Sequence, residues 1–163
     1  MYTVSDTVHV NAPMDRCFLL STNVELVRET IGMRPIAGRT SGFIDSEDQI
    51  TWYGWKFGIP HLHESRITAY ERPSFFQDTM LRGKFKRYQH DHILAAIGGL
   101  TMLNDRVRFS LPLGWVGDIV AKRVLVPYLS KMIRNRLRLL KRIAESDDWR
   151  DYLPDSLEAP IAH

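Results

Sequence analysis

The chain has 163 residues, of which 44% are hydrophobic and 25% are charged, and its 22 basic and 19 acidic side chains give a net charge of +3. This composition is that of one ordinary globular domain and excludes a disordered chain, a collagen-like repeat and a coiled-coil rod. No apolar run approaches the roughly 18 residues that a membrane-spanning helix needs. The single cysteine, Cys17, excludes an internal disulfide framework. Because no signal peptide is visible either, we expect a cytoplasmic protein.

The N-terminal segment alternates apolar and polar residues, which predicts a half-buried strand at Thr3–Val10. Two short helices are predicted at Met14–Leu20 and Val24–Thr30, and Gly32 ends the second. Six further strands follow, separated by turn sequences too short to hold crossover helices, so the sheet is predicted to be antiparallel. These strands are Ile36–Phe43, Gln49–Phe57, His61–Tyr70, Phe75–Leu81, Phe85–Ala96 and Leu100–Leu111.

The longest helical pattern runs over Val116–Ala144, where Pro127 should kink the helix or split it in two. Between Asp118 and Glu145 the chain carries basic residues and no acidic one. A solvated helix face explains this basic run, and docking on an anionic membrane surface is the alternative. We expect no nucleic-acid partner.

These elements predict one α+β domain over residues 1–145, followed by an acidic tail over residues 146–163 that runs over the surface. A single curved sheet has one face to bury, and one long helix is available to cover it. Because a straight helix touches a twisted sheet incompletely, we predict a cavity between the two.

Several short motifs occur in a fixed order along the chain. They are Ala12-Pro13 with Cys17-Phe18, Trp52 and Trp55 before Phe57-Gly58, Phe76-x-Asp78-x-Met80-x-x-Gly83-x-Phe85, His90-x-His92, and Thr101-x-Leu103-x-Asp105-x-Val107-x-Phe109 before Pro112-Leu113-Gly114. Their order and spacing over about residues 2–142 resemble the START-like, helix-grip (SRPBCC) superfamily, above all its bacterial polyketide cyclase/dehydrase-like and ligand-binding members.

This resemblance implies a helix-grip fold, with a curved antiparallel sheet of about seven strands, two short helices and a long C-terminal helix over a cavity. It also implies a hydrophobic ligand, such as a lipid, sterol, polyketide or hormone. Most proteins of this kind bind or carry their ligands and a minority are cyclases, so the fold alone does not choose between these functions.

The pair Gly98-Gly99 predicts a two-residue hairpin turn. With that turn, His92 lies opposite Asp105, His90 opposite Val107 and Tyr88 opposite Phe109. Residues that lie opposite one another share a face of the sheet, and the apolar residues of the second strand mark this face as the inner one. The pattern therefore predicts that Tyr88, His90, His92 and Asp105 lie beneath the long helix.

The preceding hairpin allows two registers. A two-residue turn at Gly83-Lys84 would direct Phe75 and Gln77 inward. One further loop residue would instead direct Phe76, Asp78 and Met80 inward and place Asp78 opposite His90. The resemblance favours the second register.

A hydrogen bond between His92 and Asp105 would satisfy two polar groups that are costly to bury unpaired. Three interpretations of this pair stay open. It is a structural pair in the core, or an anchor for a bound ligand, or a general base that removes a proton next to a carbonyl group.

Two His-x-His pairs suggest a metal site formed by His61, His63, His90 and His92. The two strands that carry them are predicted to lie about 9.6 Å apart, which requires convergent side chains, so we expect no metal. The chain also lacks nucleotide-binding, Gly-x-Ser-x-Gly and Cys-x-x-Cys motifs, so we expect no cofactor.

The sequence thus predicts a protein that binds a hydrophobic small molecule. Carriage of this molecule is an extension of the same hypothesis. Side chains that suit the cavity wall are Trp52, Trp55, Phe57, Phe76, Met80 and Trp115. The complete predicted binding set is Trp52, Trp55, Phe76, Asp78, Met80, Tyr88, His90, His92, Asp105 and Phe109. The alternatives are a cyclase/dehydratase-like enzyme using His92 with Asp105, and a protein that docks on membranes through its basic helix. The oligomeric state stays open, with a homodimer among the alternatives.

Overall fold

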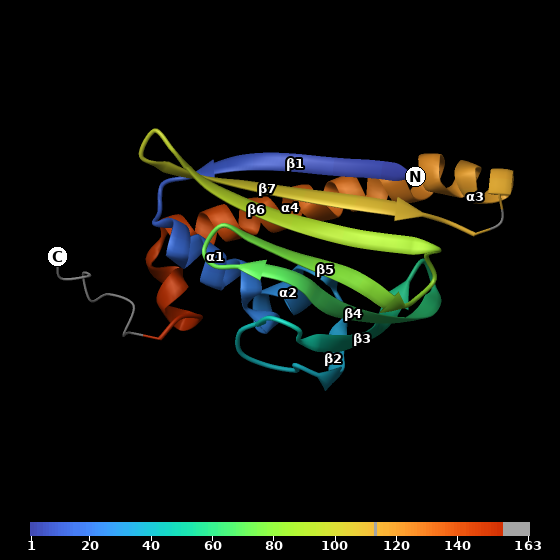
Figure 1. The fold of residues 1–163 in the computed structure, drawn as a ribbon, viewed down its shortest axis with the longest axis horizontal. Coiled ribbons are helices and arrows are strands. Elements are labelled where there is room, and N and C mark those ends of the chain that lie inside the picture. The colour runs from blue at the N-terminus through green and yellow to red at the C-terminus, as the bar shows by residue number, and fades with distance from the viewer. Residues whose placement is uncertain (113, 155–163) are drawn as a thin grey trace.

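The computed structural model describes residues 1–112 and 114–154 and contains one sheet of seven antiparallel strands (Figure 1). The strands are β1 (Tyr2–Val10), β2 (Arg34–Gly38), β3 (Gln49–Lys56), β4 (Ile59–Glu71), β5 (Phe75–Arg82), β6 (Arg87–Ile97) and β7 (Leu100–Ser110). Their order across the sheet is β1-β7-β6-β5-β4-β3-β2, so the first strand pairs with the last. The predicted antiparallel sheet is confirmed.

The second predicted strand differs most from its observed bounds, whereas the bounds of the others agree to within two residues. The chain expected to be extended over Ile36–Phe43 leaves the sheet after Gly38, where β2 ends. Gly38 has a φ of 76°, a backbone conformation that favours glycine, and a side chain there would collide with the carbonyl oxygen of Gln49. The residue that ends the strand is therefore required to be a glycine.

Two short helices, α1 (Met14–Thr22) and α2 (Val24–Ile31), follow β1 as predicted. The side chain of Asn23 separates them and accepts a hydrogen bond of 3.0 Å from the backbone N–H of Leu26, which caps α2. Gly32 ends α2 with a φ of 61°. Both helices lie on the face of the sheet that the long C-terminal helix also covers (Figure 1).

The C-terminal helical segment is divided, as Pro127 predicted. It begins as α3 (Gly114–Val120), continues through a π-helical turn (Ala121–Leu125) and becomes α4 (Val126–Glu145). Pro127 lies in the first turn of α4, where its missing N–H has the least effect on the helix. Among the described residues no helix is both long enough and apolar enough to span a membrane.

The prediction that the tail runs over the surface is wrong for the first part of the tail. A short 3-10 helix, Asp147–Asp151, follows α4 and places Trp149 in the core, where 4% of its surface is exposed. The guanidinium of Arg16 lies 4.2 Å from the centre of the Trp149 ring, and Leu153 is also buried. The remaining part of the predicted acidic tail, residues 155–163, lies outside the described residues.

The core lies between the sheet and its helices. Helix α4 packs directly on β1 and β7 at one edge of the sheet. Its buried apolar residues recur at helical spacing: Leu129, Ile133, Leu137, Leu140 and Ile143. Because α4 lies over this edge, the middle of the sheet is left without direct cover from the helix.

Replacing Ile133 by alanine tests this packing. Ile133 is fully buried, so Ile133→Ala should lower the free energy of unfolding by about 2–5 kcal/mol. The matched variant Val124→Ala removes methyl groups from a side chain that is 40% exposed and should change it by less than about 0.5 kcal/mol. Urea denaturation measures both, and equal effects would contradict the placement of α4.

Candidate functional site: a cavity under the long helix

A cavity lies between the middle of the sheet and helices α2 and α4, and water-sized molecules can occupy about 170 Å³ of it. Much of its wall is apolar, with contributions from Ile31, Ile50, Trp52, Ile67, Phe85 and Leu129. Polar side chains gather on the part that β4, β5 and β6 supply: His61, His63, Asp78, Tyr88, His90 and His92. The predicted cavity is therefore present and has two chemically different sides.

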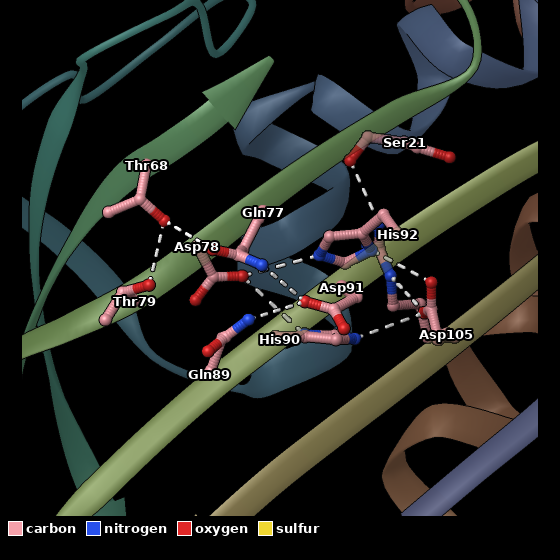
Figure 2. A network of polar contacts seen from close by, with 11 residues as sticks. Ser21, Thr68, Gln77, Asp78, Thr79, Gln89, His90, Asp91, His92 and Asp105 are labelled. Atoms are coloured by element: carbon pink, nitrogen blue, oxygen red, sulfur yellow. Dashed lines mark hydrogen bonds and ion pairs between the residues drawn. The ribbon is translucent and has the colours of Figure 1, made fainter. Parts of the chain in front are cut away.

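Both predicted hairpin registers are confirmed. Gly98 and Gly99 form the turn between β6 and β7, and His92 pairs with Asp105 across it. In the preceding hairpin Asp78 pairs with His90, which is the register that the resemblance favoured. These pairings bring four titratable side chains together from three neighbouring strands (Figure 2).

The strongest contacts of this cluster are made by Asp105. Its carboxylate accepts a hydrogen bond of 2.9 Å from His92 Nδ1 and one of 3.0 Å from Arg136 Nε. Arg136 belongs to α4 and also donates a hydrogen bond of 3.0 Å to the backbone carbonyl of Ser21 in α1. The cluster thus connects two strands with two helices, and the side chains of Asp105, His92 and Arg136 are all buried.

Asp78 and His90 complete the cluster on the side of the cavity. Asp78 Oδ2 lies 3.4 Å from His92 Nε2 and 3.7 Å from His90 Nδ1. His90 Nε2 lies 3.7 Å from Asp105 Oδ2, is buried, and has no hydrogen-bond partner among the described residues. The two histidine rings are 3.8 Å apart, and Phe76 stacks on His92 at 4.0 Å.

The two histidines have opposite pKa shifts. Burial lowers the pKa of His90, and the nearby charge of His92 lowers it further. Burial acts on His92 in the same direction, but the charge of Asp105 and the hydrogen bonds with Asp105 and Asp78 outweigh it and raise the pKa of His92. The pKa of His92 therefore lies above the ordinary value of 6.5, and that of His90 lies below it.

The two carboxyl groups stay ionised, although Asp105 is buried and Asp78 is partly buried. Burial alone raises the pKa of Asp105, but the charges of His92 and Arg136 outweigh it and hold this pKa well below its ordinary value. The pKa of Asp78 is likewise lowered, since its hydrogen bond with His92 and the nearby histidine charges outweigh burial. Two carboxylates thus lie beside two imidazoles and one guanidinium.

Tyr88 and His63 lie beside this cluster, with ring centres 5.3 Å apart. Burial raises the pKa of Tyr88 well above its ordinary value, and the charges of Asp78 and Asp105 add to the shift. Its hydroxyl is therefore protonated at neutral pH. Burial lowers the pKa of His63, so this imidazole is neutral there.

Six of the predicted binding residues line the cavity: Trp52, Phe76, Asp78, Tyr88, His90 and His92. Asp105 and Phe109 do not line it, because α4 lies directly over β7 and separates them from the open space. Met80 is also absent from the wall, and its sulfur lies close to Gly83.

Two tryptophans were expected in the wall and lie elsewhere. Trp55 is 63% exposed and Trp115, in α3, is 74% exposed. Trp52 and Trp55 lie three positions apart in β3 and therefore point to opposite faces. Phe57, by contrast, lines the cavity as predicted and contacts Tyr128 of α4 at 5.1 Å.

The four histidines of the two His-x-His pairs do not converge on one point. His61 and His63 do face the cavity, but the side chains that come together are Asp78, His90 and His92, with one donor atom from each within 4.8 Å of the others. The register of β5 against β6 supplies the carboxylate that the histidine pattern alone did not reveal.

Arg136 is the site residue that the sequence analysis missed. It was grouped with the basic run of the helix, although it falls between Ile133 and Leu140 on the apolar face of α4. A charged residue within the apolar stripe of a helix is the sequence signal that could have identified Arg136 as a buried site residue. The geometry shows that it holds the Asp105 carboxylate.

The rest of the basic run is partly neutralised. Lys141 pairs with Glu145 at 2.6 Å, and Arg134 Nε lies 3.6 Å from Asp6. Arg136 is buried and therefore does not belong to the exposed basic surface of this helix. Membrane docking through this helix stays a prediction.

Neither a protein-family model nor a curated protein matches this sequence. Solved structures match its fold. The protein TTHA0849 from Thermus thermophilus is 14% identical with a TM-score of 0.68, and the match covers 89% of this chain and 100% of that one. A START superfamily protein from Mycobacterium smegmatis is 17% identical with a TM-score of 0.61, covering 86% and 99%.

The di-domain ARO/CYC StfQ from the steffimycin biosynthetic pathway is 15% identical with a TM-score of 0.69. That match covers 90% of this chain and 51% of StfQ, so this chain spans about half the length of that protein. These likenesses confirm the fold that the motifs indicated. The chain has the START-like helix-grip fold.

The opposite shifts of the two histidines can be measured. In a histidine-detected NMR titration, His92 should lose its proton above pH 6.5 and His90 below it, because 6.5 is the ordinary pKa of both. Asp105→Asn should lower the pKa of His92, since it removes the charge that raises it. Two histidines that titrate together near pH 6.5 would contradict the assigned roles.

Proposed function

We propose that the chain binds a hydrophobic small molecule in the cavity between the sheet and helices α2 and α4, and that it can carry such a molecule. The observation that carries this proposal is a confined space of about 170 Å³ with apolar walls and a buried polar cluster on one side. Apolar burial supplies most of the affinity in such sites, and a few placed polar groups set the orientation.

The polar side favours a ligand with an oxygen atom at one end. Tyr88 lines the cavity with a protonated hydroxyl, for which no hydrogen bond is found within residues 1–112 and 114–154. A ligand carbonyl or phenol can accept this hydrogen bond, which is worth about 0.5–1.5 kcal/mol. His90, two positions from Tyr88 on the same face of β6, is a second polar group on the cavity wall near this end.

Filling the cavity tests the proposal. Ser65 lines the wall from β4 and is buried, so Ser65→Phe places a ring in the open space. We expect the affinity for the uncharged fluorescent probe N-phenyl-naphthylamine to fall at least about tenfold, which corresponds to about 1.4 kcal/mol. Fluorescence titration measures this, and native mass spectrometry of the protein from its own host shows whether a ligand is retained.

The matched control adds the same ring to β4 outside the cavity. Thr68 is exposed and contacts Gln77 and Thr79 (Figure 2). Thr68→Phe should leave probe affinity unchanged. A probe that binds Ser65→Phe as tightly as the wild type does not enter the cavity, and the proposal then fails.

The second candidate function is acid–base catalysis of the cyclase/dehydratase type. The specific observation that favours it is a pair of histidines 3.8 Å apart on the cavity wall, one with a raised and one with a lowered pKa. We assign His92, which keeps its proton to higher pH, as the acid and His90 as the base, which reverses the role first considered for His92.

A poly-β-ketone substrate tests this second function. Cyclisation followed by dehydration gives a product lighter by one water molecule, which mass spectrometry detects. His90→Gln should abolish its formation while the probe still binds. Product formation by His90→Gln at the wild-type rate would contradict catalysis by His90.

A further inference from the structure

Asp78, His90 and His92 form a compact group that binding of an apolar molecule does not require. All three line the cavity, and one donor atom from each lies within 4.8 Å of the others. We propose that these three residues, here called the β5–β6 triad, bind a divalent first-row transition ion such as Zn²⁺, with an open coordination position toward the cavity. This goes beyond the proposed function, because an apolar ligand can bind without a metal.

The separations between the triad atoms fit ligands of one ion. Asp78 Oδ2 lies 3.4 Å from His92 Nε2 and 3.7 Å from His90 Nδ1. The first separation is that of a long hydrogen bond, and the second exceeds hydrogen-bond distance. Zn²⁺ binds imidazole nitrogen and carboxylate oxygen at about 2.0–2.2 Å, so two ligands at a tetrahedral angle lie about 3.4 Å apart. Both separations are close to this value, and all three donor atoms lie within 4.8 Å of one another.

The ring nitrogens that face away from the triad are directed at one carboxylate. His92 Nδ1 donates its hydrogen to Asp105 at 2.9 Å, which leaves Nε2 toward Asp78. His90 Nε2 lies 3.7 Å from the same carboxylate and has no hydrogen-bond partner among the described residues. Metal-binding histidines normally donate their second ring N–H to a carboxylate. Asp105, held by Arg136, therefore orients His92 as a ligand, and a small movement would bring His90 Nε2 within hydrogen-bond distance of the same carboxylate.

The donor set indicates the chemistry of the ion and of its fourth ligand. Two imidazoles and one carboxylate are typical of sites for zinc and non-haem iron that keep a coordination position open. Because the three side chains line the cavity, that position opens into it. The fourth ligand would be water or an oxygen of the bound molecule, such as a carboxylate or a phenolate. Binding of the ion displaces the proton that His92 Nε2 shares with Asp78.

Metal titration of the full chain, produced without a polyhistidine tag, tests this inference. At pH 8 we expect one Zn²⁺ per chain in competition with a chelating dye, and visible absorption bands of four- or five-coordinate Co²⁺ when Co²⁺ replaces it. Asp78→Asn and His90→Ala should each lower the affinity for Zn²⁺ by at least about tenfold, since loss of an outer-shell partner already costs that much. The control His9→Ala removes an exposed histidine of β1 and should bind as the wild type does.

Two outcomes would overturn the inference: a wild-type protein that binds neither ion at micromolar concentration, or triad variants that bind Zn²⁺ as tightly as the wild type. Asp78→Asn keeps the shape of the side chain, and circular dichroism of each variant shows whether a loss of binding reflects unfolding. Probe binding measured in the presence of a chelator is independent of the metal. Failure of the metal site therefore leaves the proposed function standing, and failure of probe binding leaves the metal titration interpretable.

Discussion

The buried charge of Asp105 is the constraint on which the site depends. A carboxylate that is shielded from water requires positively charged partners. Removal of one partner from such a pair typically lowers the free energy of unfolding by about 3–5 kcal/mol. Arg136 of α4 supplies one partner and His92 of β6 the other. Because Arg136 also binds the carbonyl of Ser21 in α1, this carboxylate fixes the rotation of α4 and the position of α1 relative to the sheet. The shape of the cavity follows from these contacts.

The same carboxylate makes two neighbouring histidines chemically different. His92 makes hydrogen bonds to a carboxylate at each ring nitrogen, which raise its pKa. The ring nitrogens of His90 lie 3.7 Å from the same two carboxylates, beyond hydrogen-bond distance, and burial lowers its pKa. Sequence spacing alone treats the two as equivalent, since both belong to one His-x-His motif. Their difference arises from the strands on either side, which place Asp105 opposite His92 and Asp78 opposite His90. The neighbouring carboxylates, rather than the spacing of the motif, therefore give the two histidines different pKa values.

Local sequence rules predicted the sheet well because the turn between two strands defines which residues of those strands pair. Gly98-Gly99 predicts the pairing of His92 with Asp105 from the sequence, and strand alternation then places both side chains on the inner face. Placement relative to α4 was not predictable in this way. A helix can lie over either edge of a sheet, and here it covers β7, so Phe109 and Asp105 are buried in the core instead of facing the cavity. Trp149 was missed for a related reason, since a polar tail gives no sign that one aromatic residue returns to the core.

The apolar walls and the triad come from different parts of the fold, and this separates the two proposals physically. Trp52 and Ile50 of β3 and Ile31 of α2 supply apolar area, whereas the triad belongs to β5 and β6. The space of about 170 Å³ is small beside the roughly 300–1,000 Å³ of common ligand pockets. A compact or planar molecule fits it better than a long acyl chain, and its apolar contact area is correspondingly limited. The polar end must then contribute a larger share of the affinity, and an oxygen atom directed at Tyr88 or at an ion in the triad is the contact that the geometry offers.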